Sequence, residues 1–405
     1  MKLLKTLLGF LAFSFCAGSL ADNTPNPFST APVVIAFTRH TFRGPDESIA
    51  EPLPSFSNLS LKNNVVAYEM NATSHGLKIA QAFAEQAYNN GAQLALKTIG
   101  ENPKLAGKWS SIRADLSTER TFETGVYLDR GLSKNVSQNI AFTGVPVIGD
   151  TSTDDISTIS AAQSACYPAA TWAAQSALIK NQAFAKYTPI EDDLIELLGG
   201  TPDATPQSFP DALLVASLVE FNSDFNHFSL SNVVSGNISN SPETTKQAIQ
   251  DSLNIAGYGL FQDYYGLTAN VFSAAKVNYI NTLPAGSQQI IVTHDDNINA
   301  LLQSLGLISI QSKASDLAVY PLETITFALN SSNVAIVRTR ININPNGSMT
   351  GSSGYKSWII WSGTRAQWNA KVAAIQNNIN QYPSIASCLA KIPATQPAAI
   401  DLRLG

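Results

Sequence analysis

The chain has 405 residues, of which 44% are hydrophobic and 14% charged, and its formal net charge at pH 7 is −5. This length and apolar content support one large or two medium domains with a substantial core. Binding to a nucleic-acid polymer is excluded, because it needs a basic face or stripe. Here lysine and arginine are thinly spread among more numerous aspartate and glutamate.

Residues 1–21 have the layout of an export signal. Two lysines precede a mainly apolar run that ends at Cys16, and Ser19-Leu20-Ala21 offers small residues for cleavage. The apolar run is too short to span a bilayer of about 30 Å, which disfavours a membrane anchor. We therefore expect a periplasmic or secreted protein with no membrane attachment after cleavage. Its net charge changes from −5 to −7, because the signal removes two lysines.

The mature chain begins with alternating strand and helix patterns. Residues 32–38 form a near-continuous apolar run typical of a strand covered on both faces, and a polar loop follows it. Helical spacing of apolar residues predicts a helix over 74–90, with Gly91 as its C-cap. A second strand is predicted over 111–115. A loop and helix start follow over 117–120, and the helix continues toward 132. This order indicates parallel strands with helices on both faces of the sheet.

The pattern changes between residues 152 and 283, where stretches rich in alanine, glutamine and leucine predict helices. Strand and helix patterns then return. Strands are predicted over 289–293, 323–329 and 334–342. Residues 294–297 and a helix to Leu305 follow the first of these strands, and a last helix is predicted over 364–379. The sequence therefore predicts a three-layer α/β/α sandwich with a mixed, mainly parallel sheet, formed by residues 22–151 and 284–405, and a smaller helical insertion over 152–283.

Two predicted strands end next to a histidine, although the chain has only four histidines. His40 follows the first strand and His294 follows the strand over 289–293, and sites in parallel sheets lie at the carboxyl ends of strands. Arg39 and Arg43 bracket His40, and each guanidinium offers a planar fork to phosphate oxygens. A surface basic cluster is the alternative interpretation, but such clusters are rarely set directly behind a buried strand.

His294 is followed at once by Asp295. Taken alone, this pair favours a structural interpretation, in which the carboxylate holds the ring. Taken with the loop after the first strand, it completes what phosphoryl transfer from an ester requires. The two segments supply a nucleophile, cations for the equatorial oxygens and an acid for the leaving alkoxide.

These segments resemble the histidine acid phosphatase family, the branch of the histidine phosphatase superfamily that includes bacterial periplasmic phytases and glucose-phosphatases. Residues 39–45 read Arg-His-Thr-Phe-Arg-Gly-Pro, similar to the family's Arg-His-Gly-x-Arg-x-Pro loop, and residues 294–297 begin with its His-Asp pair. Residues 114–125 resemble the segment that brings the family's third phosphate arginine, here Arg120. The resemblance continues through Pro321-Leu322-Glu323 and both remaining cysteines, so it spans nearly the whole mature chain.

The resemblance implies a phosphoglycerate mutase-like sandwich with an all-helical cap, and a phosphatase that forms a phosphohistidine without a cofactor or metal. It implies that His40 is the nucleophile and Asp295 the proton donor. The implied phosphate-binding residues are Arg39, Arg43, Arg120 and His294. Elementary electrostatics agrees, because neighbouring arginines keep a histidine neutral and able to attack. An aspartate of ordinary pKa carries a proton only at low pH, so we expect acid activity.

The chain departs from the family pattern at Thr41, where the pattern has glycine. A positive φ would strain a β-branched threonine, so we expect a negative φ and an intact loop.

Cys166 and Cys388 are the cysteines that remain after export, and we expect them to form a disulfide. The four scattered histidines lack the spacing of a metal site. We expect His75 and His227 to take no part in the site.

The sequence thus predicts an acid phosphatase acting on phosphate monoesters. Asp46 and Glu47 follow the phosphate loop and would repel a polyphosphate such as phytate, which favours small monophosphates, unless both side chains point to solvent. The alternatives are a phytase of the same family, a phosphomutase and a non-catalytic protein that binds phosphate esters. No feature of the sequence predicts an oligomeric state.

Overall fold

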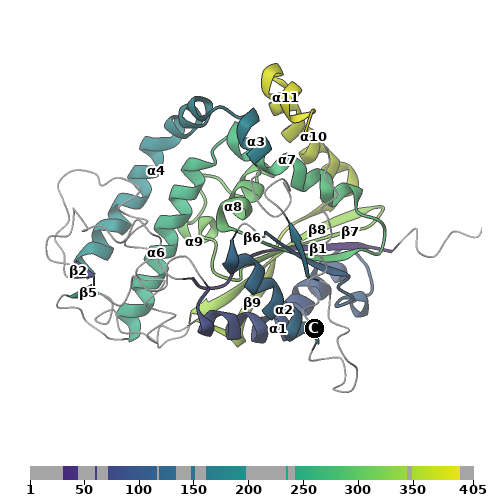
Figure 1. Cartoon of the computed structure of the whole chain (residues 1–405), viewed down its shortest axis with the longest axis horizontal. Coiled ribbons are helices and arrows are strands. Elements are labelled where there is room, and N and C mark those ends of the chain that lie inside the picture. The colour runs from purple at the N-terminus through teal and green to yellow at the C-terminus, as the bar shows by residue number, and fades with distance from the viewer. Residues whose placement is uncertain are drawn as a thin grey trace, which may run out of the picture.

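A mixed sheet forms the centre of the molecule in the computed structural model (Figure 1). The structure describes residues 31–43, 60–61, 72–115, 118–133, 147–150, 161–197, 234–235, 242–343 and 349–392. Among these residues, seven strands join in the order β4-β3-β6-β1-β7-β8-β9. They are β1 (Val33–Arg39), β3 (Ser111–Asp115), β4 (Val147–Asp150), β6 (Gln288–Thr293), β7 (Thr324–Leu329), β8 (Asn333–Ile343) and β9 (Met349–Thr364). A separate antiparallel pair consists of β2 (Ser60–Leu61) and β5 (Val234–Ser235).

The strand β1 lies in the middle of the sheet and is buried along its whole length. It pairs in parallel with β6 and antiparallel with β7. Beyond β6 the strands β3 and β4 continue in parallel, whereas β7, β8 and β9 alternate in direction. The predicted mixed sheet is confirmed, and all five predicted strands are present as β1, β3, β6, β7 and β8. Because β1 and β6 are parallel neighbours, the histidines that follow them reach the same edge of the sheet.

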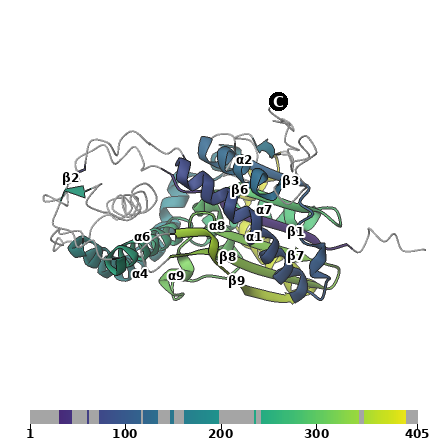
Figure 2. The same ribbon diagram turned by 90° about the horizontal axis from the view of Figure 1, so that it is seen from below.

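Helices cover both faces of the sheet, as the predicted sandwich requires. The pair α1 and α2 lies on one face, and α7, α8 and α10 lie on the other (Figures 1 and 2). The described helices are α1 (Ser74–Thr98), the 3₁₀ turn η3 (Pro103–Leu105), α2 (Glu119–Ser133), α3 (Ala161–Cys166), α4 (Ala169–Leu197), α6 (Pro242–Asp263), α7 (Leu267–Thr282), α8 (Asp295–Ser304), α9 (Ala314–Leu317), α10 (Arg365–Asn380) and α11 (Pro383–Leu389).

The prediction that Gly91 ends the first helix is wrong. The helix α1 continues to Thr98, and Gly91 lies inside it. A Cβ at this position would stand 2.9 Å from Oγ1 of Thr339 on β8. The glycine therefore allows α1 to pack closely on the sheet. The turn after the helix uses Gly100 instead, which has a φ of 83°.

The long strand β9 was not predicted. It pairs antiparallel with β8, and the register shifts between Ile336 and Val337 and again between Ile341 and Asn342. Such irregularities interrupt the period-two alternation by which a strand is recognised in sequence.

Two long helices, α4 and α6, pack side by side and extend beyond the edge of the sheet (Figure 1). They fall in the region predicted as a helical insertion, and its boundaries at residues 152 and 283 stay a prediction. Two further described helices fall in this region: α3 packs on α11, and α7 packs on α8 and α10. None of the described helices combines the length and apolar character needed to cross a membrane. The predicted export signal over 1–21 lies outside the described residues.

Candidate active site

His40 stands directly after β1, and its backbone is held by both neighbouring strands. Its amide donates to the carbonyl of Thr293 on β6 at 2.8 Å, and its carbonyl accepts from the amide of Leu322, before β7, at 3.3 Å. The residue is 2% exposed. The backbone on either side of the histidine is therefore fixed by the sheet itself.

The ring of His40 is oriented by a hydrogen bond to its own loop. Nδ1 lies 2.7 Å from the Thr41 carbonyl oxygen, to which only a protonated Nδ1 can donate. Burial lowers the pKa of His40 well below its ordinary value, and the charges of His294, Arg120 and the other nearby arginines lower it further. The ring is thus neutral, with a lone pair on Nε2.

Arg120, in the first turn of α2, reaches both histidines. Its Nε donates to Nε2 of His40 at 3.2 Å, and its Nη2 lies 3.4 Å from Nδ1 of His294. The two imidazole rings meet edge to face, with centroids 5.2 Å apart. Three segments far apart in the sequence therefore converge on one point.

His294 follows β6 and is held from its other side. Its Nε2 lies 3.5 Å from Oδ2 of Asp115, a fully buried residue at the end of β3, and 3.4 Å from Oγ1 of Thr118. No role for Asp115 was predicted from the sequence. The available signal was its position, because Asp115 ends a buried strand just as His40 and His294 follow theirs.

Asp295 begins α8 and pairs with the first of the two arginines around His40. Its Oδ2 lies 3.0 Å from Nη2 of Arg39, and its Oδ1 accepts from the amide of Asp296 at 3.1 Å. The side chain is 27% exposed. Burial raises the pKa of this carboxyl, but the charges of two arginines and His294 outweigh burial and lower it below its ordinary value. The carboxylate therefore ionises readily while these cations face it.

Arg39 is buried and contacts two partners. Its Nη1 donates to the carbonyl of Val319 at 2.8 Å, and its Nη2 pairs with the carboxylate of Asp295. Arg43 stands where the backbone forms an isolated bridge with Ala72, and its charge lowers the pKa of His40. The structure thus brings all six sequence-predicted residues of the phosphate site together. We call Arg39, His40, Arg43, Arg120, His294 and Asp295 the His40 cluster.

Thr41 is accommodated in the loop without a positive φ. Among the described residues other than glycine, Leu322 alone has a positive φ, which confirms the expectation for Thr41. The Thr41 amide donates to Oγ1 of Thr124 at 3.0 Å, and its hydroxyl donates to the carbonyl of Gly76 at 2.7 Å. A Cβ at Gly76 would stand 3.0 Å from that hydroxyl. The glycine opposite therefore leaves room for the threonine hydroxyl.

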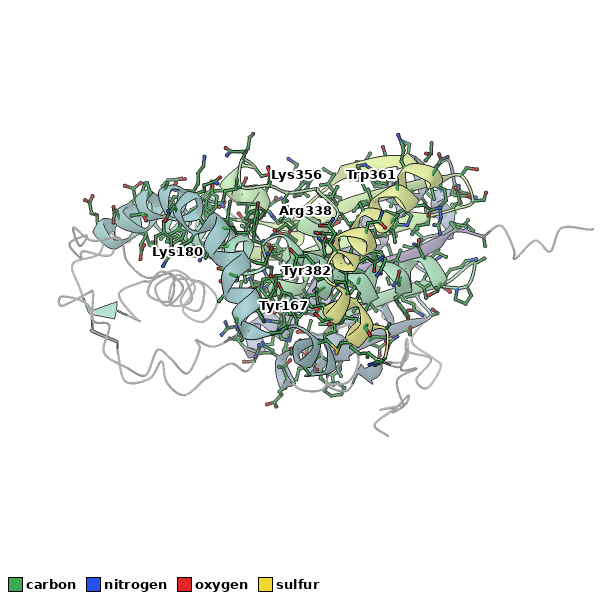
Figure 3. The ribbon with its side chains drawn as sticks, turned by 90° about the horizontal axis from the view of Figure 1, so that it is seen from above. Tyr167, Lys180, Arg338, Lys356, Trp361 and Tyr382 are labelled. Atoms are coloured by element: carbon green, nitrogen blue, oxygen red, sulfur yellow. A yellow bond between two sulfur atoms is a disulfide. The ribbon has the colours of Figure 1, made fainter. Side chains whose placement is uncertain are left out.

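The predicted disulfide between Cys166 and Cys388 is confirmed. It joins α3 to α11, and Figure 3 labels Tyr167 and Tyr382 at this junction. Within the part of the chain that the structure describes, no group of three His, Cys, Asp or Glu side chains could hold a metal ion.

A scan against protein-family models and a search of curated proteins found no match. Several solved structures are similar to the chain. Klebsiella sp. ASR1 phytase has a TM-score of 0.52 at 15% identity, covering 88% of this chain and 97% of that one. Citrobacter braakii phytase has a TM-score of 0.53 at 13% identity, and apo Hafnia alvei phytase one of 0.54 at 10%, each covering 88% of this chain and 98% of the other. The chain therefore has the fold of these bacterial phytases, which agrees with the resemblance to the histidine acid phosphatase family.

Proposed function

We propose that the chain is an acid phosphatase that hydrolyses phosphate monoesters through a phosphohistidine on His40. The orientation of the His40 ring is the observation that supports this most. Nδ1 is committed to the Thr41 carbonyl, and Nε2 faces Nε of Arg120 at 3.2 Å. The lone pair of this neutral imidazole accepts from the guanidinium, and phosphate oxygens that bind the guanidinium instead would release the lone pair to attack phosphorus.

In the first step the Nε2 lone pair of His40 attacks phosphorus, and the bond from phosphorus to the ester oxygen breaks. Asp295 gives its proton to the departing oxygen. The three arginines and His294 neutralise the equatorial oxygens of the phosphoryl group. In the second step water attacks phosphorus, the phosphorus–nitrogen bond breaks, and the Asp295 carboxylate takes a proton from the water.

The pH dependence follows from the two shifted groups. The lowered pKa of His40 keeps the nucleophile neutral in acid. The lowered pKa of Asp295 means that the free protein holds this proton only in acid. A bound phosphate dianion engages the same arginines and raises the pKa of Asp295 toward protonation. Activity is therefore highest in acid and falls as Asp295 ionises.

Two substrate classes are compatible with this chemistry. The preference for small monophosphates rests on Asp46 and Glu47, which lie outside the described residues. Phytate is the second candidate, because the similar structures are phytases and one, from Hafnia alvei, is a complex with myo-inositol hexakis sulphate. The ratio of kcat/KM for phytate and glucose phosphate, measured at acid pH on one preparation, decides between them.

The remaining alternatives differ in their products. A phosphomutase would return the phosphoryl group to substrate and yield an isomer, whereas a binding protein would release nothing. We propose that the protein acts in the periplasm or outside the cell, on the basis of the signal-like residues 1–21 and the disulfide.

Trapping of the intermediate tests the proposal. Wild-type protein quenched during turnover of a labelled ester should carry phosphate that is labile to acid and stable to base. His40→Ala should lose the label and reduce turnover by about 10⁴-fold or more, as when a covalent nucleophile is removed. His75→Ala serves as the control and should keep both. Full turnover in His40→Ala would sink the mechanism.

A further inference from the structure

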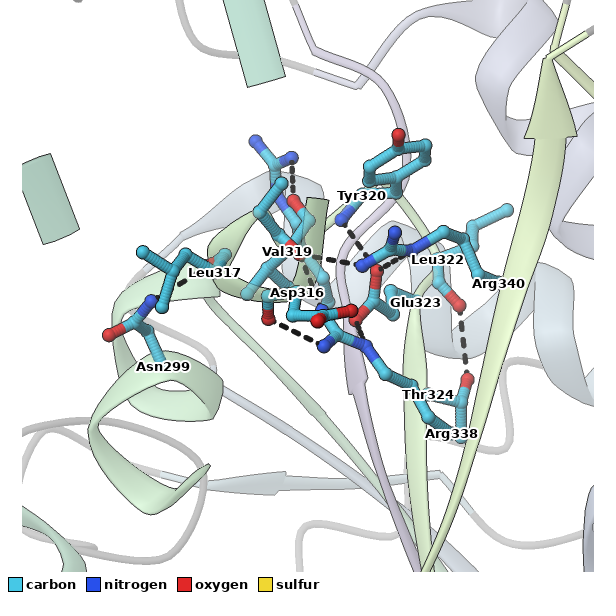
Figure 4. A network of polar contacts seen from close by, with 12 residues as sticks. Asn299, Asp316, Leu317, Val319, Tyr320, Leu322, Glu323, Thr324, Arg338 and Arg340 are labelled. Atoms are coloured by element: carbon cyan, nitrogen blue, oxygen red, sulfur yellow. Dashed lines mark hydrogen bonds and ion pairs between the residues drawn. The ribbon is translucent and has the colours of Figure 1, made fainter. Parts of the chain in front are cut away.

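Glu323 occupies a fully buried position just before β7 and is bound by two arginines of β8. Its Oε1 accepts from Nε of Arg338, and its Oε2 lies 2.6 Å from Nε of Arg340 (Figure 4). The amide of Tyr320 also donates to Oε2 at 3.0 Å. Burial raises the pKa of Glu323, but the two arginines outweigh burial and lower it below its ordinary value. We call Glu323, Arg338 and Arg340 the Glu323 cluster.

The two arginines also hold the chain segment that precedes Glu323. Nη1 of Arg338 donates to the carbonyl of Asp316 at 2.6 Å, and Nη2 of Arg340 donates to that of Ala318 at 2.8 Å. Nη2 of Arg338 donates to the Ala318 carbonyl as well. Because residues two apart on a strand share a face, both guanidiniums reach the same stretch of backbone. Residues 316–323 are thus fastened to β8 by charge-assisted hydrogen bonds.

The same segment contacts the His40 cluster. The carbonyl of Val319 accepts from Nη1 of Arg39 at 2.8 Å, and the carbonyl of Glu323 accepts from the Arg39 amide at 2.9 Å. The amide of Leu322 donates to the His40 carbonyl at 3.3 Å. Any shift of residues 316–323 would therefore move the Arg39 guanidinium and the backbone that carries His40.

Leu322 shows that this segment is held under constraint. Its φ of 59° lies in the left-handed region, which is strained for a residue other than glycine. The hydroxyls of Thr38 and Thr324 donate to its carbonyl at 3.2 and 3.0 Å. A conformation of this kind persists when its surroundings determine it, and here those surroundings lie beside the site.

We propose that Glu323, Arg338 and Arg340 are positioning residues, which fix residues 316–323 and thereby the Arg39 guanidinium and the His40 backbone for phosphate binding. A buried ion pair adds little stability compared with apolar side chains of similar size, which leaves geometry as its main contribution. Charge-assisted bonds are short and directional, and two of these bonds end on the Ala318 carbonyl, next to the Val319 carbonyl that Arg39 contacts. The inference rests on the proposed function and deepens it.

Arg340→Lys tests the proposal, because it keeps a cation on β8 but removes the planar fork that joins Glu323 to the Ala318 carbonyl. We expect kcat/KM to fall by about tenfold to a hundredfold, in line with a misplacement of up to 1 Å. Inorganic phosphate should bind at least several-fold more weakly by calorimetry. Ile336→Ala is the matched control, since Ile336 is a buried apolar residue of the same strand. It should lower Tm and leave the phosphate affinity unchanged.

Thr324→Val provides a second variant if Arg340→Lys does not fold. It removes one of the two hydroxyls on the Leu322 carbonyl and should weaken phosphate binding in the same direction by a smaller factor. Folded Arg340→Lys with wild-type phosphate affinity would overturn the inference, as would an equal loss of affinity in Ile336→Ala. Wild-type protein that binds phosphate but hydrolyses no ester would contradict the proposed function, and the binding data would still decide the inference.

Discussion

The His40 cluster and the Glu323 cluster both contact residues 316–323. Arg39 binds a carboxylate and a backbone carbonyl, as the arginines of the Glu323 cluster do, but Arg120 has different partners. In the Glu323 cluster both guanidiniums end on a carboxylate and on backbone carbonyls, and the carboxylate is fully buried. In the His40 cluster Arg120 ends on two imidazole nitrogens, and Asp295 is 27% exposed. Phosphate oxygens can displace a neutral imidazole from a guanidinium far more easily than they can displace a buried carboxylate. The Glu323 cluster is therefore suited to hold a structure, and the His40 cluster to exchange a ligand.

The largest expected effect is on the chemistry of the His40 cluster. Asp295→Asn should reduce kcat for an alkyl ester such as glucose phosphate by about 10³-fold, because the leaving oxygen loses its proton donor. Nitrophenyl phosphate should lose much less, and the fall in activity with rising pH should disappear. Steady-state rates for both esters across acid pH provide the measurement. Asp296→Asn is the neighbouring control, and equal losses for both esters in Asp295→Asn would argue against the acid role.

A substitution in the Glu323 cluster should lower the stability of the fold. Glu323→Gln should lower the free energy of unfolding by about 3–5 kcal/mol, because it leaves two buried guanidiniums without their carboxylate. The pKa of Glu323 is lowered on folding, so its contribution is complete above the unfolded pKa of about 4.3 and is lost as pH falls through the folded pKa. Urea denaturation at pH 7 and at pH 3 should therefore show a smaller difference from wild type in acid. Unchanged stability at pH 7 would mean that the comparison between the clusters is wrong.

Removing the disulfide should lower the stability of the fold without weakening phosphate binding. Cys166 and Cys388 are 222 residues apart, and neither α3 nor α11 contributes a residue to either cluster. Replacing both cysteines by serine should cost about 2–4 kcal/mol, less than the chain-entropy value of about 5 kcal/mol. Thermal unfolding and phosphate inhibition, measured together, test this expectation. A large loss of phosphate affinity at a temperature where the variant is folded would contradict it.

The smallest effect is expected at Asp263, the last residue of α6, whose burial raises its pKa to about 6. This is the opposite direction to the pKa of Glu323, which two arginines surround. The stabilisation that the protonated carboxyl of Asp263 gives the folded state is complete below the pKa of this group in the unfolded chain. It is lost as pH rises through about 6. Asp263→Asn should thus be more stable than wild type by about 1–2 kcal/mol at pH 7, after discounting for partial exposure, and equal to it near pH 3. A gain that persists at pH 3 would assign the effect to something other than ionisation.

Much of the fold could be predicted because its strands are short apolar runs with clear polar boundaries. The positions of His40 and His294 directly after two such runs were enough to place both at one edge of a parallel sheet. Arg120 was reached through the family resemblance, since nothing in its local pattern distinguishes it from other surface arginines. The error at Gly91 arose because a glycine that ends a helix and one that packs against a strand look the same in sequence.

Sequence alone predicts the strand that precedes His40, the polar loop with two arginines and the pair His294-Asp295, because these features depend on neighbouring residues. Three contacts could be seen only in the folded chain. Asp115 faces His294, Glu323 binds Arg338 and Arg340, and residues 316–323 reach Arg39. These contacts connect residues between 15 and 280 positions apart. Local periodicity carries no information about such pairs, since they form only when the sheet brings its strands into register.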